Sequence, residues 1–269
     1  MARRVLFLVP ALVLALAFTA CVELDSAWGG RSRVRGSGDV ERESRHVSGI
    51  HAVELATIGT LIIEIGNDEG LVIEAEDNLL EHIETDVSRG KLTIDNERDV
   101  SLNPRKRIRY YLTVKELDEI TVSSSGDIVA PDLEAKRFEL SIESSGDFEM
   151  GTLDCTALEV SISSSGDAFI EELSARTVDV SISSSGSLEI GDGTVEEQEV
   201  HISSSGDYRA RRLDSETAVV RISSSGSAHV RVRDRLDATT SSSGDVNYYG
   251  DPRVRSRETS SGDVHRAGR

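Results

Sequence analysis

Aspartate and serine side chains recur at fixed positions of a repeat, and they are the residues of this 269-residue chain best placed to do chemistry. A Ser-Ser-Gly string occurs in eight copies, whose glycines are Gly126, Gly146, Gly166, Gly186, Gly206, Gly226, Gly244 and Gly262. Asp follows the glycine in six copies, and Ser187 and Ser227 follow it in the other two. Carboxylates repeated in this way could bind a cation or, in pairs, hydrolyse a glycosidic bond.

Calcium is the cation that stacked aspartates suggest. Asp127, Asp147 and Asp167 are the candidate ligands, since they would resemble the acidic columns of calcium-binding β-rolls. Those rolls use nonapeptide repeats with two glycine-rich turns per coil, whereas here the acids are interrupted at Ser187 and Ser227. A structural role is favoured, in which glycine permits a positive φ at the corner and aspartate bonds to the backbone. We expect no cofactor and no metal, with calcium as the alternative.

Glycoside hydrolysis is the second chemistry that the carboxylates could perform. Stacking would place Asp147 and Asp167 about 5 Å apart, near the separation in a retaining glycosidase. Any repeated aspartate would give that separation, so the signal is not specific. The histidines show no zinc-binding spacing, and no nucleophile elbow or phosphate-binding loop is present. Nothing basic adjoins Cys155 to activate it. We predict that the protein is not an enzyme.

The repeat predicts the elements that position these residues. Successive glycines are 20 residues apart in the first five intervals and 18 apart in the last two. Before each glycine, apolar residues such as Val160 and Ile162 flank a polar one, which is the alternation of a half-buried strand. After it, residues such as Phe148 and Met150 continue the alternation. Each unit therefore predicts two short strands around a corner, with a second turn near a recurring leucine.

A β-solenoid explains this pattern better than its alternatives. Coils that pair with each other at about 4.8 Å stack identical positions into columns. An antiparallel sandwich predicts turns every 8–12 residues, and a propeller blade needs about 40 residues. We predict an all-β fold, a parallel β-helix of about 20-residue coils over residues 36–265. Residues 117–265 are the regular repeats, and residues 36–116 are irregular first coils that cap the stack.

Residues 40–116 keep strand-like runs without the repeated string. The predicted strands cover residues 52–55, 59–65, 71–75, 91–94 and 108–114. A helical turn over residues 78–83 is expected to start at Asp77 or Asn78 as its N-cap. The Gly-Ser-Gly-Asp sequence of residues 36–39 suggests an earlier copy of the corner turn. The last coils are more polar and richer in arginine, which indicates a frayed or capping end.

The N-terminal segment predicts export and a lipid anchor. A basic start precedes an apolar run over residues 5–20 that is too short for a comfortable membrane span. The run ends in Phe18-Thr19-Ala20-Cys21, which resembles a bacterial lipobox, although Phe18 stands where Leu is usual. We predict a lipoprotein signal peptide at residues 1–20, lipidation of Cys21 and a tether over residues 21–35. An ordinary secretory signal with an incidental cysteine is the alternative.

Composition excludes some partners. The formal net charge of −18 and the pI of about 4.8 argue against nucleic-acid or anionic-membrane binding through a basic face. Outward positions are acidic in the early coils and basic in the later ones, at Glu139, Glu159, Asp179 and Glu199 and then at Arg209, Arg211, Arg212, Arg221, Arg231, Arg233 and Arg235. A surface balanced for solubility is favoured as the explanation. Tyr208, Tyr248 and Tyr249 could stack on sugars, but the first two occupy inward positions and predict core packing.

Several segments together resemble one known family. They are residues 36–40, 50, 66–68, 76–85 and 90–94, the Ser-Gly-Asp turns, and residues 248–252. Over about residues 36–265 the chain resembles the putative auto-transporter adhesin, head GIN domain family of bacterial exported proteins. The resemblance implies a right-handed β-helix-like stack on the cell envelope. It favours an adhesion role, and the family has no catalytic residues that could be assigned to this chain. The chain departs from the family in using Ser-Ser-Gly where relatives often have Gly-Ser-Gly.

The sequence thus predicts a non-enzymatic, lipid-anchored envelope protein with an adhesion or surface-binding role. A carbohydrate-active β-helix enzyme and a structural envelope protein without a specific ligand are the alternatives. The expected partners are the membrane, through the lipid, and envelope glycans or surface proteins, with no nucleic acid. The expected location is the cell envelope, at the outer membrane if the cell is Gram-negative.

Overall fold

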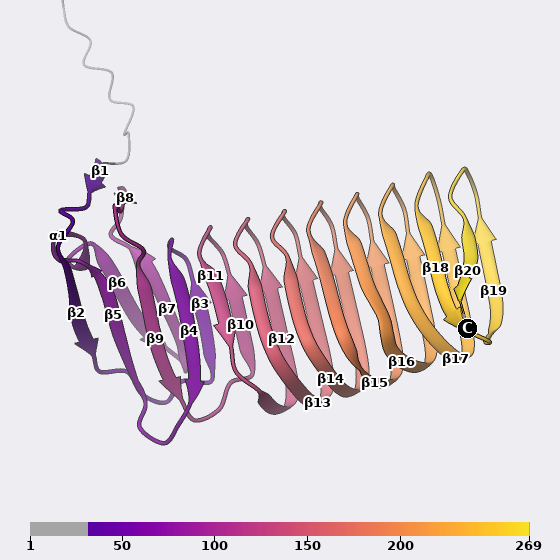
Figure 1. The fold of residues 1–269 in the computed structure, drawn as a ribbon, viewed down its shortest axis with the longest axis horizontal. Helices are drawn as coiled ribbons and strands as arrows, with labels where there is room; N and C mark the ends of the chain where they lie inside the picture. Colours follow the sequence, from indigo (N-terminus) through magenta and orange to yellow (C-terminus); the bar gives the residue numbers. More distant parts are fainter. Residues whose placement is uncertain (1–31, 269) are drawn as a thin grey trace, which may run out of the picture. The chain divides into compact units, whose positions relative to one another are not determined.

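The computed structural model describes residues 32–268, which form a parallel β-solenoid (Figure 1). The predicted signal peptide, Cys21 and most of the predicted tether lie outside these residues. Successive coils pair in parallel along the whole regular part, so the predicted all-β fold with coils of about 20 residues is confirmed. The regular strands are β10 (Glu119–Val122), β11 (Asp127–Ala130), β12 (Leu133–Ile142), β13 (Phe148–Ile162), β14 (Ala168–Ile182), β15 (Ser187–Ile202), β16 (Asp207–Ile222), β17 (Ser227–Thr240), β18 (Asp245–Gly250), β19 (Arg253–Glu258) and β20 (Val264–Gly268).

From β13 to β17 each coil is one long strand that bends, rather than the two short strands predicted from the sequence. The hydrogen-bonded register of β13 with β14 continues past Leu153, where the sequence predicts a turn. Leu153 is fully buried, so the recurring leucine is a core residue at the bend. The strand remains continuous because both neighbouring coils bend at the same position and keep their backbone bonds.

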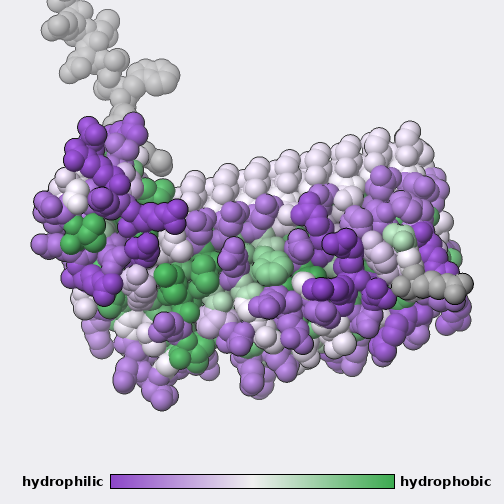
Figure 2. Space-filling view, viewed as in Figure 1, coloured by the Kyte–Doolittle hydropathy of each residue, from purple (hydrophilic) through white to green (hydrophobic). Residues whose placement is uncertain are grey.

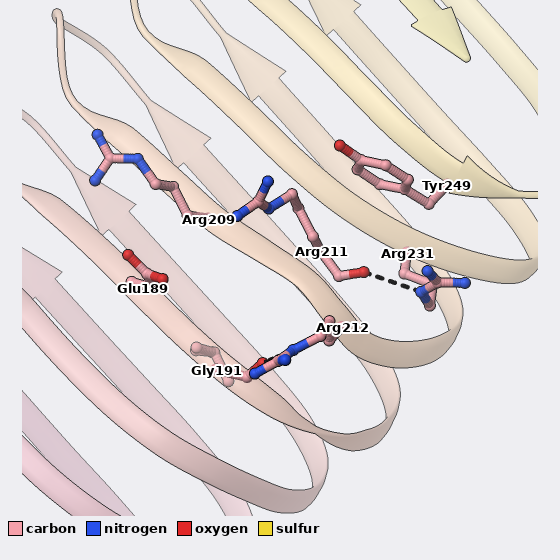
Figure 3. Close-up of a pocket in the computed structure, with 8 residues that line it drawn as sticks. Glu189, Gly191, Arg209, Arg211, Arg212, Arg231 and Tyr249 are labelled. Carbon is pink, nitrogen blue, oxygen red and sulfur yellow. Dashed lines mark hydrogen bonds between the residues drawn. The ribbon is translucent and has the colours of Figure 1, made fainter. Parts of the chain in front are cut away.

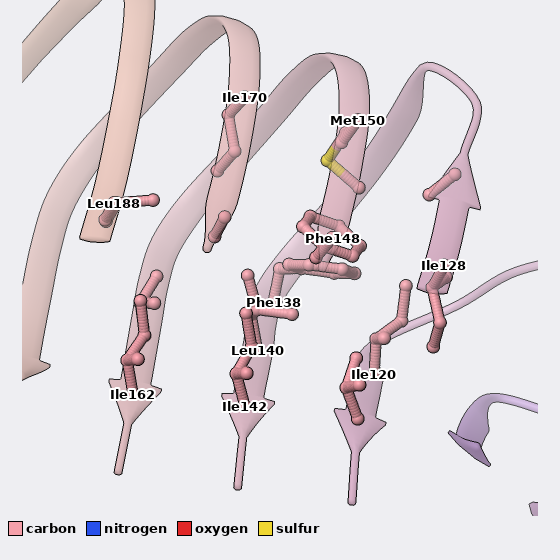
Figure 4. Packing of buried hydrophobic residues seen from close by; sticks show 14 of the residues in the cluster. Ile120, Ile128, Phe138, Leu140, Ile142, Phe148, Met150, Ile162, Ile170 and Leu188 are labelled. Carbon is pink, nitrogen blue, oxygen red and sulfur yellow. The ribbon is translucent and has the colours of Figure 1, made fainter. Parts of the chain in front are cut away.

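The core fills the interior of the coils with columns of aliphatic side chains. Ile142 and Ile162 lie in register in successive coils (Figure 4). Ile182 continues this column, and all three side chains are fully buried. Another inward column contains side chains of different size, since Phe148 is in register with Ala168. The outward positions between them are hydrophilic over most of the face in Figure 2. The alternation predicted from the sequence is therefore the inward and outward alternation of the coil.

The N-terminal elements complete the stack out of sequence order. They are β1 (Ser32–Arg35), β2 (Val40–Arg45), β3 (Ala52–Leu55), β4 (Thr60–Ile65), β5 (Gly70–Glu76), α1 (Asp77–Leu80), β6 (Ile83–Ser88), β7 (Lys91–Asn96), β8 (Val100–Asn103) and β9 (Arg109–Val114). Strand β3 pairs with both β7 and β10, and β4 pairs with both β9 and β11. The coil made by β3 and β4 therefore lies between the coil made by β7 and β9 and the coil made by β10 and β11.

Antiparallel strands close this end of the stack, as a capping region should. Strand β5 pairs antiparallel with β9, β6 pairs with β7, and β2 pairs with β5. The outer strand β2 carries alternating charges, from Glu41 to Arg45, which disfavour the addition of a further strand. The opposite end has the same protection, because every residue of β19 is exposed and three of its six residues are arginines.

Three N-terminal expectations need correction. The last four residues of the predicted tether form β1, which pairs with β8. Residues 36–39 do not form a solenoid corner, because they lie beside α1, where the backbone N–H of Ser37 donates to Oδ1 of Asn78 at 2.8 Å. The N-cap of α1 is Glu76, with no side-chain capping bond, rather than Asp77 or Asn78. These departures share one cause, since the local sequence does not show which distant strand each segment meets.

The corner glycines are required by close stacking and not by a positive φ, which corrects the expectation from the sequence. None of the Ser-Ser-Gly glycines has a positive φ. A Cβ on Gly166 would lie 2.8 Å from Cγ2 of Ile142 and closer still to the carbonyl oxygen of Gly146. Each corner therefore approaches the previous one too closely for any side chain at this position.

This close approach predicts a strong position effect for the smallest substitution. Gly166→Ala should lower the free energy of unfolding by about 1–3 kcal/mol, the usual range for overpacking, measured by urea denaturation. Gly70→Ala is the matched control, because its added Cβ would meet nothing within 4 Å. Equal stability of the two variants would contradict the steric explanation.

Candidate ligand-binding site

The corner aspartates lie in one column, and their carboxylates bond to the following coil. Oδ1 of Asp127 accepts a hydrogen bond from the backbone N–H of Asp147 at 3.2 Å, and Oδ1 of Asp147 accepts one from Asp167 at 3.0 Å. Oδ1 of Asp167 accepts two bonds from Ser187, from its backbone N–H and its hydroxyl, both at 2.8 Å. Ser227 makes the same hydroxyl contact with the coil before it. Each serine thus replaces a contact between like charges with a hydrogen bond.

The structure gives these candidate cation ligands a role in joining coils. Asp127, Asp147 and Asp167 are in register, as expected, and their side chains face along the stack toward backbone donors. Within residues 32–268, no cluster of three or more His, Cys, Asp or Glu side chains could hold a metal ion.

Cys155 is buried in the core. Its burial, with a smaller contribution from the charge of Asp154, raises the pKa of the thiol to about 11. The thiol is therefore protonated at neutral pH and is a poor nucleophile. It packs in the core between coils and contributes no chemistry to the outer surface.

A second column on the outer surface is acidic over five consecutive coils. Its members in stacking order are Glu119, Glu139, Glu159, Asp179 and Glu199. Cations neutralise most of this column, since Lys91 bridges Glu54 and Glu119, Arg137 pairs with Glu159, and Arg221 pairs with Glu199. The predicted outward acids are confirmed, and the structure adds Glu119 to them.

Asp179 lies between two other acids of this column and forms no ion pair with another described residue. Partial desolvation, followed by the charges of Glu199 and Glu159, raises the pKa of its carboxyl, and His201 opposes this shift. The folded state therefore binds a proton at Asp179 more tightly than the unfolded chain does. Ionised Asp179 opposes folding at neutral pH, and that cost disappears as the pH falls below the usual pKa range of a carboxyl group.

One hollow in the outer surface is lined by arginines. The pocket has a volume of about 420 Å³ and is lined by Glu189, Ile190, Gly191, Arg209, Arg211, Arg212, Arg231 and Tyr249 (Figure 3). These residues come from β15, β16, β17 and β18. Four guanidinium groups and one carboxylate therefore meet on a protein whose net charge is −18. We call this site the arginine pocket.

The arginine pocket arises where the repeat shortens. The register of β16 with β17 jumps from Ala210 opposite Val230 to Asp214 opposite Arg231, so residues 211–213 have no direct partners in β17. Such a bulge bends the strand and changes the direction of its side chains. The shortening from 20 to 18 residues between Gly226 and Gly244 is the sequence signal of this irregularity. The sequence analysis noted the interval and the arginines separately and did not predict the pocket.

Three of the four guanidinium groups are held in place by the surrounding coils. Arg209 pairs with Asp207 at 2.6 Å, and Nε of Arg212 donates to the carbonyl oxygen of Gly191 at 2.7 Å. Nε of Arg231 donates to the carbonyl oxygen of Arg211 at 2.9 Å (Figure 3). The guanidinium of Arg211 makes no hydrogen bond or ion pair with another residue among 32–268, so all five of its N–H donors are available.

A buried polar network supports the pocket from inside. The hydroxyl of Tyr208 donates to Gln198 at 3.0 Å, and Nε2 of Gln198 donates to Oγ of Ser215 at 2.8 Å. The hydroxyl of Ser215 donates to the carbonyl oxygen of Arg231 at 2.7 Å. Tyr208 is fully buried, which confirms its predicted core position. The network pairs these three buried side chains with one another and holds the backbone that carries Arg231.

An aromatic and an imidazole ring border the same site. Cζ of Arg231 lies over the ring of Tyr249, 5.8 Å from the ring centroid. The rings of Tyr249 and His229 are stacked, with their centroids 6.5 Å apart. Burial of His229, followed by the charge of Arg211, lowers the pKa of its imidazole, so His229 is neutral at pH 7. The positive charge of the site therefore comes from the arginines. Tyr248 is only partly buried and packs against the core.

No helix within residues 32–268 has the length and apolar character needed to cross a bilayer. The fold defines a class, the parallel β-solenoids with a capped first end. The model of the family described as putative auto-transporter adhesin, head GIN domain, matches residues 50–171 and 151–252. The chain belongs to this family, whose members are surface or exported proteins, and the resemblance inferred from the sequence is confirmed.

Solved structures share the fold at low sequence identity. A protein described as a putative adhesin from Parabacteroides merdae ATCC 43184 is 19% identical, with a TM-score of 0.81 over 88% of this chain and 99% of its own. A protein described as a putative lipid binding protein from Parabacteroides distasonis ATCC 8503 is 24% identical, with a TM-score of 0.81 over 88% of this chain and 100% of its own. These likenesses establish the fold alone. No curated protein matches the chain in sequence.

The position of Asp179 between two acids predicts a stabilising substitution. Asp179→Asn should raise the free energy of unfolding at pH 7 by up to about 1 kcal/mol, because it removes a like-charge contact on the sheet. The gain should shrink as the pH falls through the carboxyl range, where wild-type Asp179 becomes protonated. Thermal unfolding at several pH values would measure it.

Glu149→Gln removes the same charge from a position whose register partners, Val129 and Phe169, are uncharged, and serves as the control. A gain for Asp179→Asn that persists unchanged at low pH would contradict the electrostatic cause.

Proposed function

We propose that this protein is held at the cell envelope by a lipid on Cys21 and binds a surface partner through its solenoid without catalysing a reaction. Membership of an adhesin family supports the surface-binding role. The observation that carries the proposal is the arginine pocket, which collects four cations and a tyrosine on an acidic protein. In a Gram-negative cell the anchor would lie in the outer membrane.

The lining of the pocket favours binding over hydrolysis. A glycosidase needs two carboxyl groups that flank the scissile bond. Of the residues that line the arginine pocket, Glu189 alone carries a carboxylate. Backbone contacts and an ion pair hold Arg209, Arg212 and Arg231 in place, which suits recognition of a fixed shape.

One observation favours a carbohydrate-active enzyme as the second candidate. Asp179 has a raised pKa and stacks between Glu159 and Glu199, and a general acid with a neighbouring carboxylate has this arrangement. Hydrolysis of a polysaccharide panel that is lost in Asp179→Asn and Glu159→Gln would establish this alternative in place of the first.

Binding to the envelope is the direct test of the main proposal. Purified protein should bind intact cells or isolated envelope glycans in a sedimentation assay. Binding should be equal with added calcium and with a calcium chelator, because the corner carboxylates bond to neighbouring coils. A dependence on calcium would instead favour cation binding at Asp127, Asp147 and Asp167. No detectable binding would favour a structural envelope protein without a specific ligand.

The proposed anchor has its own test. Cys21→Ser should abolish incorporation of labelled fatty acid and release the protein from the membrane fraction, because the acylated thiol is removed. Cys155→Ser is the control, since Cys155 is buried in the core and should leave labelling unchanged. Labelling that persists in Cys21→Ser would overturn the lipoprotein assignment.

A further inference from the structure

We infer that the arginine pocket binds an acidic saccharide, a sugar that carries a carboxylate or sulfate group among neutral hydroxyls, with Arg211 as the main contact of the anionic group. The inference rests on the proposed surface-binding function and deepens it by naming the class of ligand. It is carried by the free guanidinium, by the mixed lining of the pocket and by the bulge that forms it.

Arg211 is the group that an anion would meet. Its side chain is exposed and has no hydrogen-bond or ion-pair partner among residues 32–268, whereas Arg209, Arg212 and Arg231 are oriented by neighbouring groups. In Figure 3 the guanidinium of Arg211 lies between Arg209 and the ring of Tyr249. A planar guanidinium can donate two parallel hydrogen bonds to a carboxylate or sulfate, which makes it well suited to this contact.

The other lining groups indicate that the ligand is more than a bare anion. Glu189 and the hydroxyl of Tyr249 line the pocket and form no hydrogen bonds or ion pairs with other described residues. A carboxylate accepts bonds from sugar hydroxyls, and a phenol can donate or accept. Glu189 would repel a second negative charge, so the lining favours one acidic group per sugar over a polyanion such as nucleic acid.

The shape of the pocket agrees with this ligand. Its volume of about 420 Å³ is within the range of small-molecule sites, of about 300–1,000 Å³. Apolar ligands are bound in pockets lined mainly by hydrophobic side chains, whereas most of the residues that line this pocket are charged. An open, charged and hydroxyl-accepting hollow on the outer surface suits one residue of a longer saccharide chain.

Isothermal titration calorimetry of the purified protein can test the inference. The probes are trigalacturonate, a sulfated galactose oligosaccharide, neutral galactotriose and inorganic sulfate. At least one acidic oligosaccharide should bind more tightly than galactotriose. Arg211→Ala should weaken that binding about tenfold or more, the effect of losing a charge-assisted contact. Arg176→Ala is the matched control, since Arg176 is exposed, has no partner among residues 32–268 and lies on β14 outside the pocket.

A second variant separates a saccharide from an ion. Tyr249→Phe removes only the hydroxyl and should weaken binding of the acidic oligosaccharide while leaving that of inorganic sulfate unchanged. Equal affinity for the neutral and acidic sugars, or equal effects of Arg211→Ala and Arg176→Ala, would overturn the inference. The inference would also be overturned if inorganic sulfate bound as tightly as the sulfated oligosaccharide and Tyr249→Phe changed neither affinity. The pocket would then be a simple anion site.

The same variants distinguish this inference from the proposed function. If Arg211→Ala binds cells as well as the wild-type protein does, the surface-binding function stands and the role of the pocket in it is refuted. Binding of an acidic oligosaccharide that depends on Arg211, without adhesion to cells or envelope glycans, would establish the ligand class and refute the adhesion role.

Discussion

Parallel backbone hydrogen bonding between successive coils is the interaction on which the rest of the structure depends. It fixes the distance between coils and places equivalent residues directly over one another. Every position of the repeat therefore forms a column. Each side chain must pack against the equivalent side chain of the next coil, about 4.8 Å away. Isoleucine satisfies this condition inside the coil, where Ile142, Ile162 and Ile182 pack in register. At the corner the previous carbonyl oxygen is so close that only glycine is accommodated.

The same stacking makes charge a problem along the axis. Identical acids in successive coils repel each other, and the chain relieves this repulsion in two ways. At the corner, aspartates bond to backbone donors of the next coil, and Ser187 places a hydroxyl donor where another carboxylate would stand. On the outer face, arginines from neighbouring columns pair with Glu159 and Glu199. Glu139 and Asp179 have no such partner among residues 32–268, and at Asp179 the charges of Glu199 and Glu159 contribute to a raised carboxyl pKa.

Regular stacking also makes a uniform surface, so recognition of a particular ligand requires an interruption. The interruption occurs where β17 is shorter than β16 and residues 211–213 have no partners in β17. The bulge breaks the columns and brings arginines from different coils around one hollow. Beneath it, the hydrogen bonds of Tyr208, Gln198 and Ser215 link β15 and β16 to the backbone of Arg231.

The sequence by itself determined the class of fold, the coil length and most of the inward positions. These follow from the alternation of polar and apolar side chains and from the repeat, which are local properties, as Val160 and Ile162 show. Only the tertiary structure decided the order of the first coils, the steric role of the corner glycines and the arginine pocket. Each of these depends on what a segment meets in another coil, and β3 meets β10 across more than sixty residues of chain. Interval lengths of 20 and 18 are visible in the sequence, but the direction in which the surplus residues bulge is set by packing between coils.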